Sequence, residues 1–284
     1  MLKKLMSVIA VGFAFAVLAF TTTASAEETK LYGYSIPIDI DINGNYIENP
    51  GKGILCDDGL VYVPLRYVSN VFGANVVWEE SLADAVVTAP DKVLVFDPAS
   101  QGCYVNDCWI PAAQMMKDGV LYVDSKFIFT WLGGCVLWDD YRYEVKVTVP
   151  GFTLPNEYIE KFYTPNDLYW LSKIVTCEAG SVSFEAQVMV SNVILNRRAS
   201  SSFPNTVYDV IYDRRYGIQF SPAYSGKLSR ANPSTKTVLA CKAALNGLDL
   251  APGCLYFIYA SNKNGWIART RPLYKVLGNQ AFYK

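Results

Sequence analysis

An internal repeat constrains the fold of this 284-residue chain more than any other feature. The stretch "DGLVYVPLRYVSNVFGANVVWEESLADAVVT", which begins at Asp58, aligns without gaps on "DGVLYVDSKFIFTWLGGCVLWDDYRYEVKVT", which begins at Asp118. Each unit predicts a turn, a short strand, a helix over 65–72 or 125–132, a glycine turn and two strands. Two such units pack on each other to bury their apolar faces, so residues 30–150 are predicted to form one small α+β domain.

The repeat also carries a resemblance to a known domain. Gly73 falls on Gly133 and Trp78 falls on Trp138 at the same 60-residue shift. With "DGLVYVPLRYVSNVFGANVVW" at its centre, the domain resembles the copper-amine-oxidase N-terminal-like domain that is often fused to exported bacterial enzymes. The chain contains no histidine, so we expect it to bind no copper. The resemblance then implies a noncatalytic role, and wall binding and a purely structural spacer are both open.

The first 26 residues have the pattern of a secretory signal peptide. Lys3 and Lys4 precede an apolar run from about Leu5 to Phe20, and "ASA" at 24–26 forms a small-residue cleavage site. The alternative is a membrane anchor, but the run is short for a spanning helix and the cleavage pattern follows it. We expect cleavage near Ala26 and a protein that is secreted or associated with the cell envelope.

The cysteines add little to this framework. An exported chain with seven cysteines allows disulfides and leaves at least one thiol unpaired. "CYVNDC" places Cys103 and Cys108 across a predicted hairpin, and this is the one pairing that the spacing suggests.

The absence of histidine removes most hydrolytic mechanisms. Serine triads, Cys/His sites and His-bearing zinc sites all need an imidazole, and no C-x-x-C pair offers another metal site, so we expect neither a metal nor a cofactor. The 25 basic and 26 acidic residues give a formal charge of -1, which argues against nucleic acid as a partner. Carboxylates remain, and they suffice to cleave glycosidic bonds.

The rest of the chain predicts a second, mainly helical domain at 165–284 with a small sheet. The segment 151–164 is rich in proline and glycine and is predicted to be a linker. Thr164 has the pattern of a helix cap, Ser183 of a second one before a central buried helix, and Asn232 of a third before a helix that ends at Gly247. "CLYFIYA" and "QAFYK" predict short strands.

Glu178 is the residue of most interest in this domain. Leu168, Leu171 and Val175 fall on one face of the first helix, and the next position on that stripe is Glu178. Burial there and the negative end of the helix both raise the pKa of a carboxyl group, as a general acid requires. The alternative is an exposed helix end. For Glu185, two residues after the Ser183 cap, a capping role is favoured over catalysis.

The stretch "LSKIVTCEAGSVSFEAQVMVSNVILNRRASSSFPNTVYDVIY" resembles the spore-cortex-lytic cell wall hydrolases. That family has an apolar helix ending in E-A-R-G-E, then E-G-Q-V-A-V-A-x-V-x-L-N-R, then F-P-x-T-V-x-x-V-I. The match continues through "QFSPAYSG", "LYF", Trp266 and "GNQAFYK". The resemblance implies a lysozyme-like fold and cleavage of peptidoglycan glycan strands between N-acetylmuramic acid and N-acetylglucosamine.

The resemblance also implies roles for individual residues. The catalytic acid of the family falls on Glu178. Four residues fall on positions that line the glycan cleft, with a core position as the open alternative for the second of them: Gln219, Phe220, Ser221 and Tyr256. Asn196 and Arg197 match the L-N-R element and are interpreted as structural.

One departure from the family affects the loop after the acid. The family has E-A-R-G-E where this chain has Glu178-Ala179-Gly180-Ser181-Val182, so an arginine and the second acid are missing. A single carboxylate favours a lytic transglycosylase, in which Glu178 serves as acid and then as base. A hydrolytic muramidase and a catalytically degenerate wall-binding protein are the alternatives.

Overall fold

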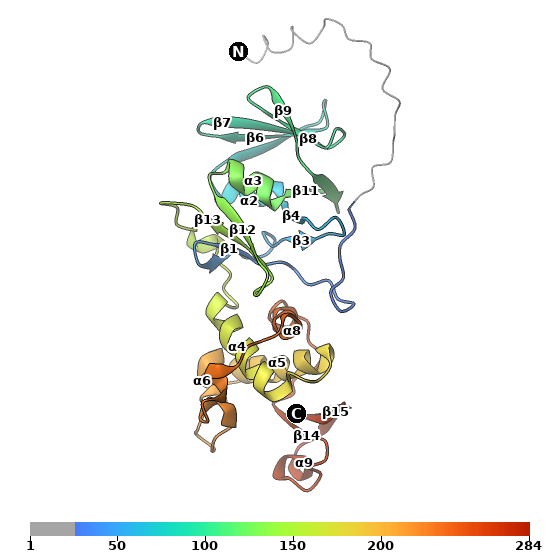
Figure 1. The fold of residues 1–284 in the computed structure, drawn as a ribbon, viewed down its shortest axis with the longest axis vertical. Helices are drawn as coiled ribbons and strands as arrows, with labels where there is room; N and C mark the ends of the chain where they lie inside the picture. The colour runs from blue at the N-terminus through green and yellow to red at the C-terminus, as the bar shows by residue number, and fades with distance from the viewer. Residues whose placement is uncertain (1–25) are drawn as a thin grey trace, which may run out of the picture.

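The computed structural model describes residues 26–284, and the predicted signal peptide lies outside them apart from its last residue. The chain forms an N-terminal β-rich domain and a C-terminal helical domain stacked end to end (Figure 1). Within the described part of the chain, no helix has the length and apolar character needed to cross a bilayer. The predicted α+β class is confirmed, and the described chain has a β-rich part followed by a mainly helical one.

The N-terminal domain is built from short strands around two helices. The sheets run in the orders β12-β13-β1-β2, β10-β11-β4-β3 and β5-β6-β7-β8-β9. Its elements are β1 (Ile40–Ile42), β2 (Asn45–Tyr46), β3 (Ile54–Leu55), β4 (Val61–Pro64), α2 (Leu65–Val71), β5 (Asn75–Glu79), β6 (Asp84–Ala89), β7 (Lys92–Asp97), β8 (Gly102–Val105), β9 (Cys108–Pro111), β10 (Gln114–Lys117), β11 (Val120–Asp124), α3 (Ser125–Trp131), β12 (Cys135–Asp139) and β13 (Glu144–Thr148).

Elements of this domain recur at the spacing of the sequence repeat. α2 and α3 begin 60 residues apart, and so do β5 and β12. The strands before the helices pair antiparallel, with Val63 opposite Val123, and both valines are fully buried. The Gly73 and Gly133 turns that follow the helices have φ of +75° and +91°, a conformation that favours glycine. The two units therefore share one core.

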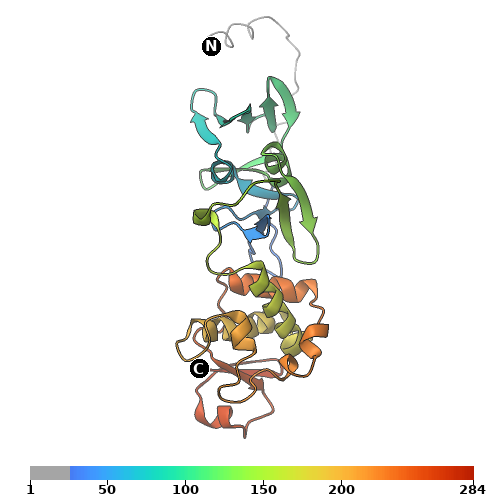
Figure 2. The same ribbon diagram turned by 90° about the vertical axis from the view of Figure 1, so that its left-hand side faces the viewer.

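The C-terminal domain surrounds the buried helix α5, which packs against α8 and α4. The small sheet, in the order β14-β16-β15, lies at the end of the molecule away from the N-terminal domain (Figure 2). The elements are α4 (Pro165–Ala179), α5 (Phe184–Ala199), α6 (Val207–Ile211), the 3-10 turn η2 (Ser221–Ala223), α7 (Lys227–Arg230), α8 (Thr235–Leu245), β14 (Tyr256–Tyr259), α9 (Trp266–Thr270), β15 (Leu273–Leu277) and β16 (Gln280–Tyr283).

Two local predictions were wrong. The cap of α8 is Ser234, whose hydroxyl accepts from the backbone N–H of Thr237, so Asn232 lies outside the helix. Cys103 and Cys108 are both free thiols, although the predicted hairpin is present. The register of β8 and β9 pairs Cys103 with Ile110 and Cys108 with Val105, so the two thiols are not opposite each other.

The predicted linker is packed against the N-terminal domain rather than extended away from it. Phe152 stacks on Phe72 with ring centroids 4.5 Å apart, and Leu154 is buried. A 3-10 turn, η1 (Asn156–Tyr158), follows, and the backbone N–H of Glu160 donates to the Tyr46 carbonyl at 2.8 Å. These contacts fix where the first helix of the C-terminal domain begins.

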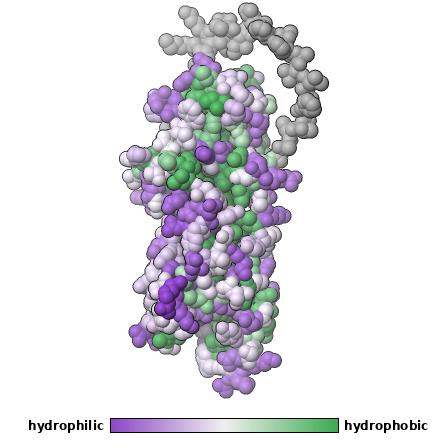
Figure 3. Space-filling view, viewed as in Figure 1, coloured by the Kyte–Doolittle hydropathy of each residue, from purple (hydrophilic) through white to green (hydrophobic). Residues whose placement is uncertain are grey.

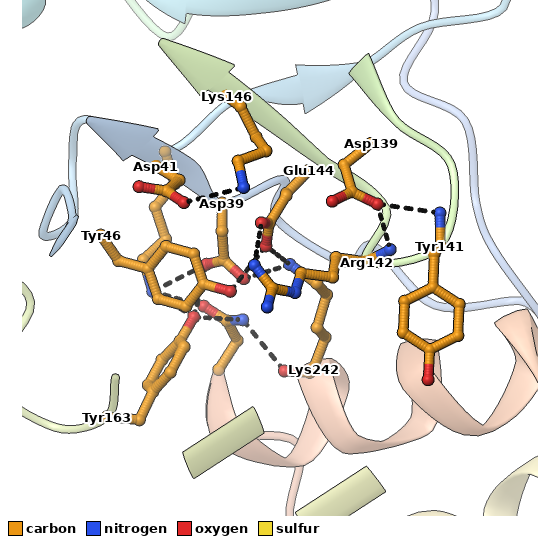
Figure 4. Close-up of polar contacts among 12 residues, drawn as sticks. Asp39, Asp41, Tyr46, Asp139, Tyr141, Arg142, Glu144, Lys146, Tyr163 and Lys242 are labelled. Atoms are coloured by element: carbon orange, nitrogen blue, oxygen red, sulfur yellow. Dashed lines mark hydrogen bonds and ion pairs between the residues drawn. The ribbon is translucent and has the colours of Figure 1, made fainter. Parts of the chain in front are cut away.

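A buried cluster of charges joins the two domains (Figure 4). Lys242 of α8 is fully buried, and its Nζ lies 2.5 Å from Asp39 and 3.5 Å from Glu144, both also fully buried in the N-terminal domain. Lys52 adds an ion pair with Glu160 at 2.8 Å and lies 3.6 Å from Asp39. Burial alone would raise the pKa of Asp39, but Lys242 and Lys52 hold it below its usual value.

Candidate active site

Local sequence signals bring Glu178 to the end of α4. The helix begins at a capping box in which Thr164 accepts from the Asp167 backbone and Asp167 accepts from the Thr164 backbone. Its apolar stripe, including Leu171 and Val175, is buried in the domain core, which fixes the rotation of the helix. Glu178 follows on that stripe in the last turn and is half-buried. The structure therefore does not show the alternative, an exposed helix end.

Glu178 lies where two surface pockets meet. The larger pocket, of about 430 Å³, is bounded by the end of α4, the 180–182 loop and the start of α8. The smaller, of about 200 Å³, is bounded by β14 and β16. Glu178 and Tyr259 line both pockets, so this acidic residue lies at the border between them.

The surroundings of Glu178 favour its protonated form. Burial raises the pKa of its carboxyl group. The last turn of α4 carries no basic residue, and the helix C-terminus adds negative potential in the same direction. Glu178 is the only carboxylate among the residues that line the two pockets. The site thus holds one acid that can act as a proton donor.

Cys177 lies beside the acid and lines the larger pocket. Burial, and then the charge of Glu178, raise the pKa of its thiol, so it stays protonated and is a poor nucleophile. With no histidine in the chain to activate it, this cysteine does not form a Cys/His site.

Three other acids of this domain lie outside the two pockets. Glu185 is in the first turn of α5 and does not line either pocket. Asp209 accepts from the Thr206 hydroxyl at the start of α6. Asp213 accepts from Arg215, whose side chain holds the pKa of Asp213 below its usual value. Asp209 and Asp213 thus have structural roles, and Glu185 lies near the N-terminus of its helix.

None of the four predicted cleft residues lines the pockets that Glu178 lines. Phe220 is 2% exposed and packs against Phe257 with ring centroids 6.3 Å apart, which is the core position left open for it. Tyr256 is half-buried beneath Arg271, which lies 5.0 Å from its ring. The Gln219 amide donates to Gly217, and Ser221 is exposed at the start of η2.

The L-N-R element is structural, as interpreted from the sequence. The Asn196 amide donates to the carbonyls of Ala251 and Cys254. Arg197 donates to the Leu255 carbonyl at 2.7 Å and lies 5.4 Å from the Phe220 ring. These bonds tie the central helix to the chain that leads into β14.

Sequence reasoning missed the residues that complete the depression. Tyr259, Asn262, Asn279 and Gln280 come from the small sheet and its loops. β14 pairs with β16 so that Tyr259 is opposite Gln280, which brings both to the end of α4. Two of these residues, Asn279 and Gln280, belong to the motif "GNQAFYK". No local pattern in the sequence indicates that β14 pairs with β16.

Gln187 of α5 supports the loop after the acid. Its amide nitrogen donates to the carbonyls of Gly180 and Val182. Lys236 of α8 donates to the same Val182 carbonyl at 2.8 Å. The loop is therefore held from two helices, although it lacks the arginine and the second acid of the family motif.

The residues present do not fit copper. The sequence has no histidine, and within residues 26–284 no three Cys, Asp or Glu side chains form a group that could hold a metal ion.

Comparisons with known proteins divide the chain in the same way as the structure. Residues 181–283 match the cell wall hydrolase family, beginning three residues after Glu178, and residues 41–147 match the copper amine oxidase N-terminal domain. A spore cortex-lytic enzyme from Oceanobacillus iheyensis is 34% identical over 131 residues, which are 46% of this chain and 46% of that protein. The match thus spans about half the length of this relative.

Two further relatives match a similar share of this chain. A spore cortex-lytic enzyme from Bacillus cereus is 33% identical over 43% of this chain and 46% of its own length. The solved catalytic domain of the germination-specific lytic transglycosylase SleB from Bacillus anthracis is 32% identical, with a TM-score of 0.40 over 44% of this chain and 99% of that domain. Residues 181–283 thus belong to the cell wall hydrolase family, in a chain whose residues 41–147 form a copper amine oxidase N-terminal-like domain.

Proposed function

We propose that this protein cleaves the glycan strands of peptidoglycan at the bond between N-acetylmuramic acid and N-acetylglucosamine, with Glu178 as the catalytic acid. The observation that carries the proposal is a single half-buried carboxyl group, with a raised pKa, in an open depression of a cell wall hydrolase domain. The relatives named as spore cortex-lytic enzymes and the lytic transglycosylase SleB support this substrate class.

The single acid favours a lytic transglycosylase. Protonated Glu178 donates its proton to the oxygen of the leaving sugar as the glycosidic bond breaks, and the acetamido group of the substrate stabilises the positive charge that develops at C1. The Glu178 carboxylate then accepts the proton of the muramyl 6-hydroxyl as that oxygen bonds to C1. Two-carboxylate glycosidases place their acids roughly 5 to 9.5 Å apart, and no second acid lines these pockets.

Mass spectrometry of the products tests this route. Digestion of purified sacculi by the full chain is expected to release muropeptides that end in 1,6-anhydro-muramic acid. The anhydro product is lighter by one water than the hydrolytic product. Release of reducing-end muramic acid only would show that water is the nucleophile and that the protein is a hydrolytic muramidase.

We further propose that the N-terminal domain binds the cell wall through a groove of about 610 Å³ beside α2. Three aromatic rings line it, those of Tyr67, Trp78 and Tyr122, with the polar side chains of Arg66 and Asn70. Rings with polar neighbours are suited to a sugar face and its hydroxyl groups. On the face shown in Figure 3, apolar residues are most frequent over this domain.

A matched pair of tryptophans tests this binding role. In a Glu178→Gln background, Trp78→Ala is expected to weaken sedimentation with sacculi by roughly tenfold, about 1.4 kcal/mol. Trp138→Ala removes the equivalent ring of the second repeat, which is 38% exposed and does not line the groove, and should leave binding unchanged. Equal binding by both variants would indicate the spacer role instead.

The place of action follows from the substrate. Peptidoglycan lies outside the cytoplasm, so we propose export with cleavage near Ala26, as the N-terminal pattern predicts. N-terminal sequencing of the protein recovered from the culture medium or the cell envelope would identify the first residue.

A further inference from the structure

Gln280, at the start of β16, is bound directly to the residue proposed as the acid. Its side chain is 3% exposed, and its amide nitrogen donates to the backbone carbonyl of Glu178 at 3.0 Å. Opposite it across the sheet are Tyr259 and Leu277. The amide is therefore held at the end of α4, 102 residues away along the chain.

The oxygen of the same amide is buried without a hydrogen-bond partner among the described residues. Because a carbonyl oxygen can only accept, the contact with Glu178 must come from the nitrogen, and the orientation of the amide is fixed. A buried acceptor without a donor costs about 1–3 kcal/mol, so such an atom calls for a partner.

Few groups near this oxygen can supply a proton. The smaller pocket, which Gln280 lines, contains three side chains able to donate: Tyr259, Asn262 and Glu178 when it is protonated. Tyr259 is 65% exposed and Asn262 is also exposed, so water satisfies both. Glu178 is half-buried, and the backbone of this residue already bonds to the Gln280 amide.

We propose that Gln280 is a positioning residue that accepts a hydrogen bond from the protonated carboxyl group of Glu178 in the free enzyme. An acceptor for the neutral form stabilises that form over the carboxylate, in addition to the effect of burial. When substrate arrives, its glycosidic oxygen replaces the amide oxygen as the acceptor of the same proton. The inference rests on the proposed function, and it gives the proton of Glu178 an acceptor before substrate binds.

Five other titratable or charged side chains surround the site, and the variants used in the test leave them unchanged. None of them is ion-paired with Glu178 within the described residues. They are Cys177 and Lys173 of α4, Tyr259 of β14, Lys227 of α7 and Lys236 of α8.

The test is the pH profile of kcat/KM for muropeptide release by full-length Gln280→Met. Methionine fills a similar volume without the amide oxygen, so the ionised form of Glu178 is less disfavoured. On the alkaline limb of the profile, kcat/KM falls because the acid has lost its proton. In the variant this limb is expected to lie at lower pH by about one unit. A limb that stays in place while activity falls at every pH would overturn the proposal and leave Gln280 a structural role.

Gln114 offers a matched control in the N-terminal domain. It is also buried, its amide nitrogen also donates to backbone carbonyls, and its amide oxygen also has no partner among the described residues. Gln114→Met should leave the alkaline limb unchanged, and a shift equal to that of Gln280→Met would overturn the proposal. If wild-type protein releases no muropeptides, the proposed function fails first, and a carbon-13 titration of Glu178 in Gln280→Met tests the hydrogen bond alone.

Discussion

Glu178→Gln is expected to abolish release of muropeptides from sacculi, with a loss of at least roughly 10³-fold, while the protein still sediments with them. Glutamine keeps the size of the side chain but has no proton to give to the leaving oxygen and cannot act as a base. No other carboxylate lines the pockets, so no neighbouring acid can replace it.

Glu185→Gln is the matched control for this variant. Glu185 lies seven positions further along the chain, in the first turn of α5, and outside both pockets. It is expected to lose no more than the few tenths of a kcal/mol of stability that an acid near a helix N-terminus supplies, with activity unchanged. If wild-type protein sediments with sacculi but releases nothing, the protein is a degenerate binding protein instead of an enzyme.

Lys242→Ala is expected to lower the free energy of unfolding by roughly 3 kcal/mol, because it leaves buried carboxylates without a close cation. Asp39 would keep Lys52 at 3.6 Å, and Glu144 would keep Arg142 at 3.7 Å. Neither replaces the Nζ of Lys242, which lies 2.5 Å from Asp39. Urea denaturation followed by tryptophan fluorescence measures the change.

Two comparisons separate the buried pair from a general effect of losing a lysine. Lys146 lies 3.8 Å from Asp41 and is 40% exposed, so Lys146→Ala should cost less than about 1 kcal/mol. The double variant Asp39→Leu, Lys242→Met removes both charges and should recover much of the loss. Equal losses for Lys146→Ala and Lys242→Ala would show that the cluster does not hold the domains together.

Lys242→Ala also tests a link between the domain interface and the candidate active site. α8 carries Lys242 in its last turn, while Thr237 of its first turn and its Ser234 cap line the larger pocket. If α8 loses its anchor in the N-terminal domain, Ser234 and Thr237 are expected to move away from their places beside Glu178.

Local patterns predicted the parts of the molecule that depend on local physics. The capping box at Thr164, the cap at Ser183 and the position of Glu178 each follow from a few neighbouring residues, and the structure shows them. The cap at Asn232 was misplaced by two residues because Ser234 offers a hydroxyl in better register with the N–H of Thr237. Helix ends are decided by such small differences.

Contacts between residues far apart in the chain are the part of the structure that could not be predicted from the sequence. Gln280 reaches Glu178 from 102 residues away, through a sheet whose pairing no local pattern specifies. Asp39 and Lys242 are 203 residues apart, and each looks like a surface charge in its own segment. The glycan contacts of Gln219, Ser221 and Tyr256 were inferred from the family resemblance alone and stay predictions. These residues do not line the two pockets that Glu178 lines.

The pKa of Glu178 tests the central claim most directly. Carbon-13 labelling of glutamate side chains allows each carboxyl group to be followed by NMR as the pH is raised, and Glu178→Gln identifies the signal by its loss. The signal of Glu178 should titrate above the usual value of 4.5, since burial disfavours the charged form. Titration at or below 4.5 would mean that the carboxyl group is ionised when substrate binds, and that it cannot be the proton donor.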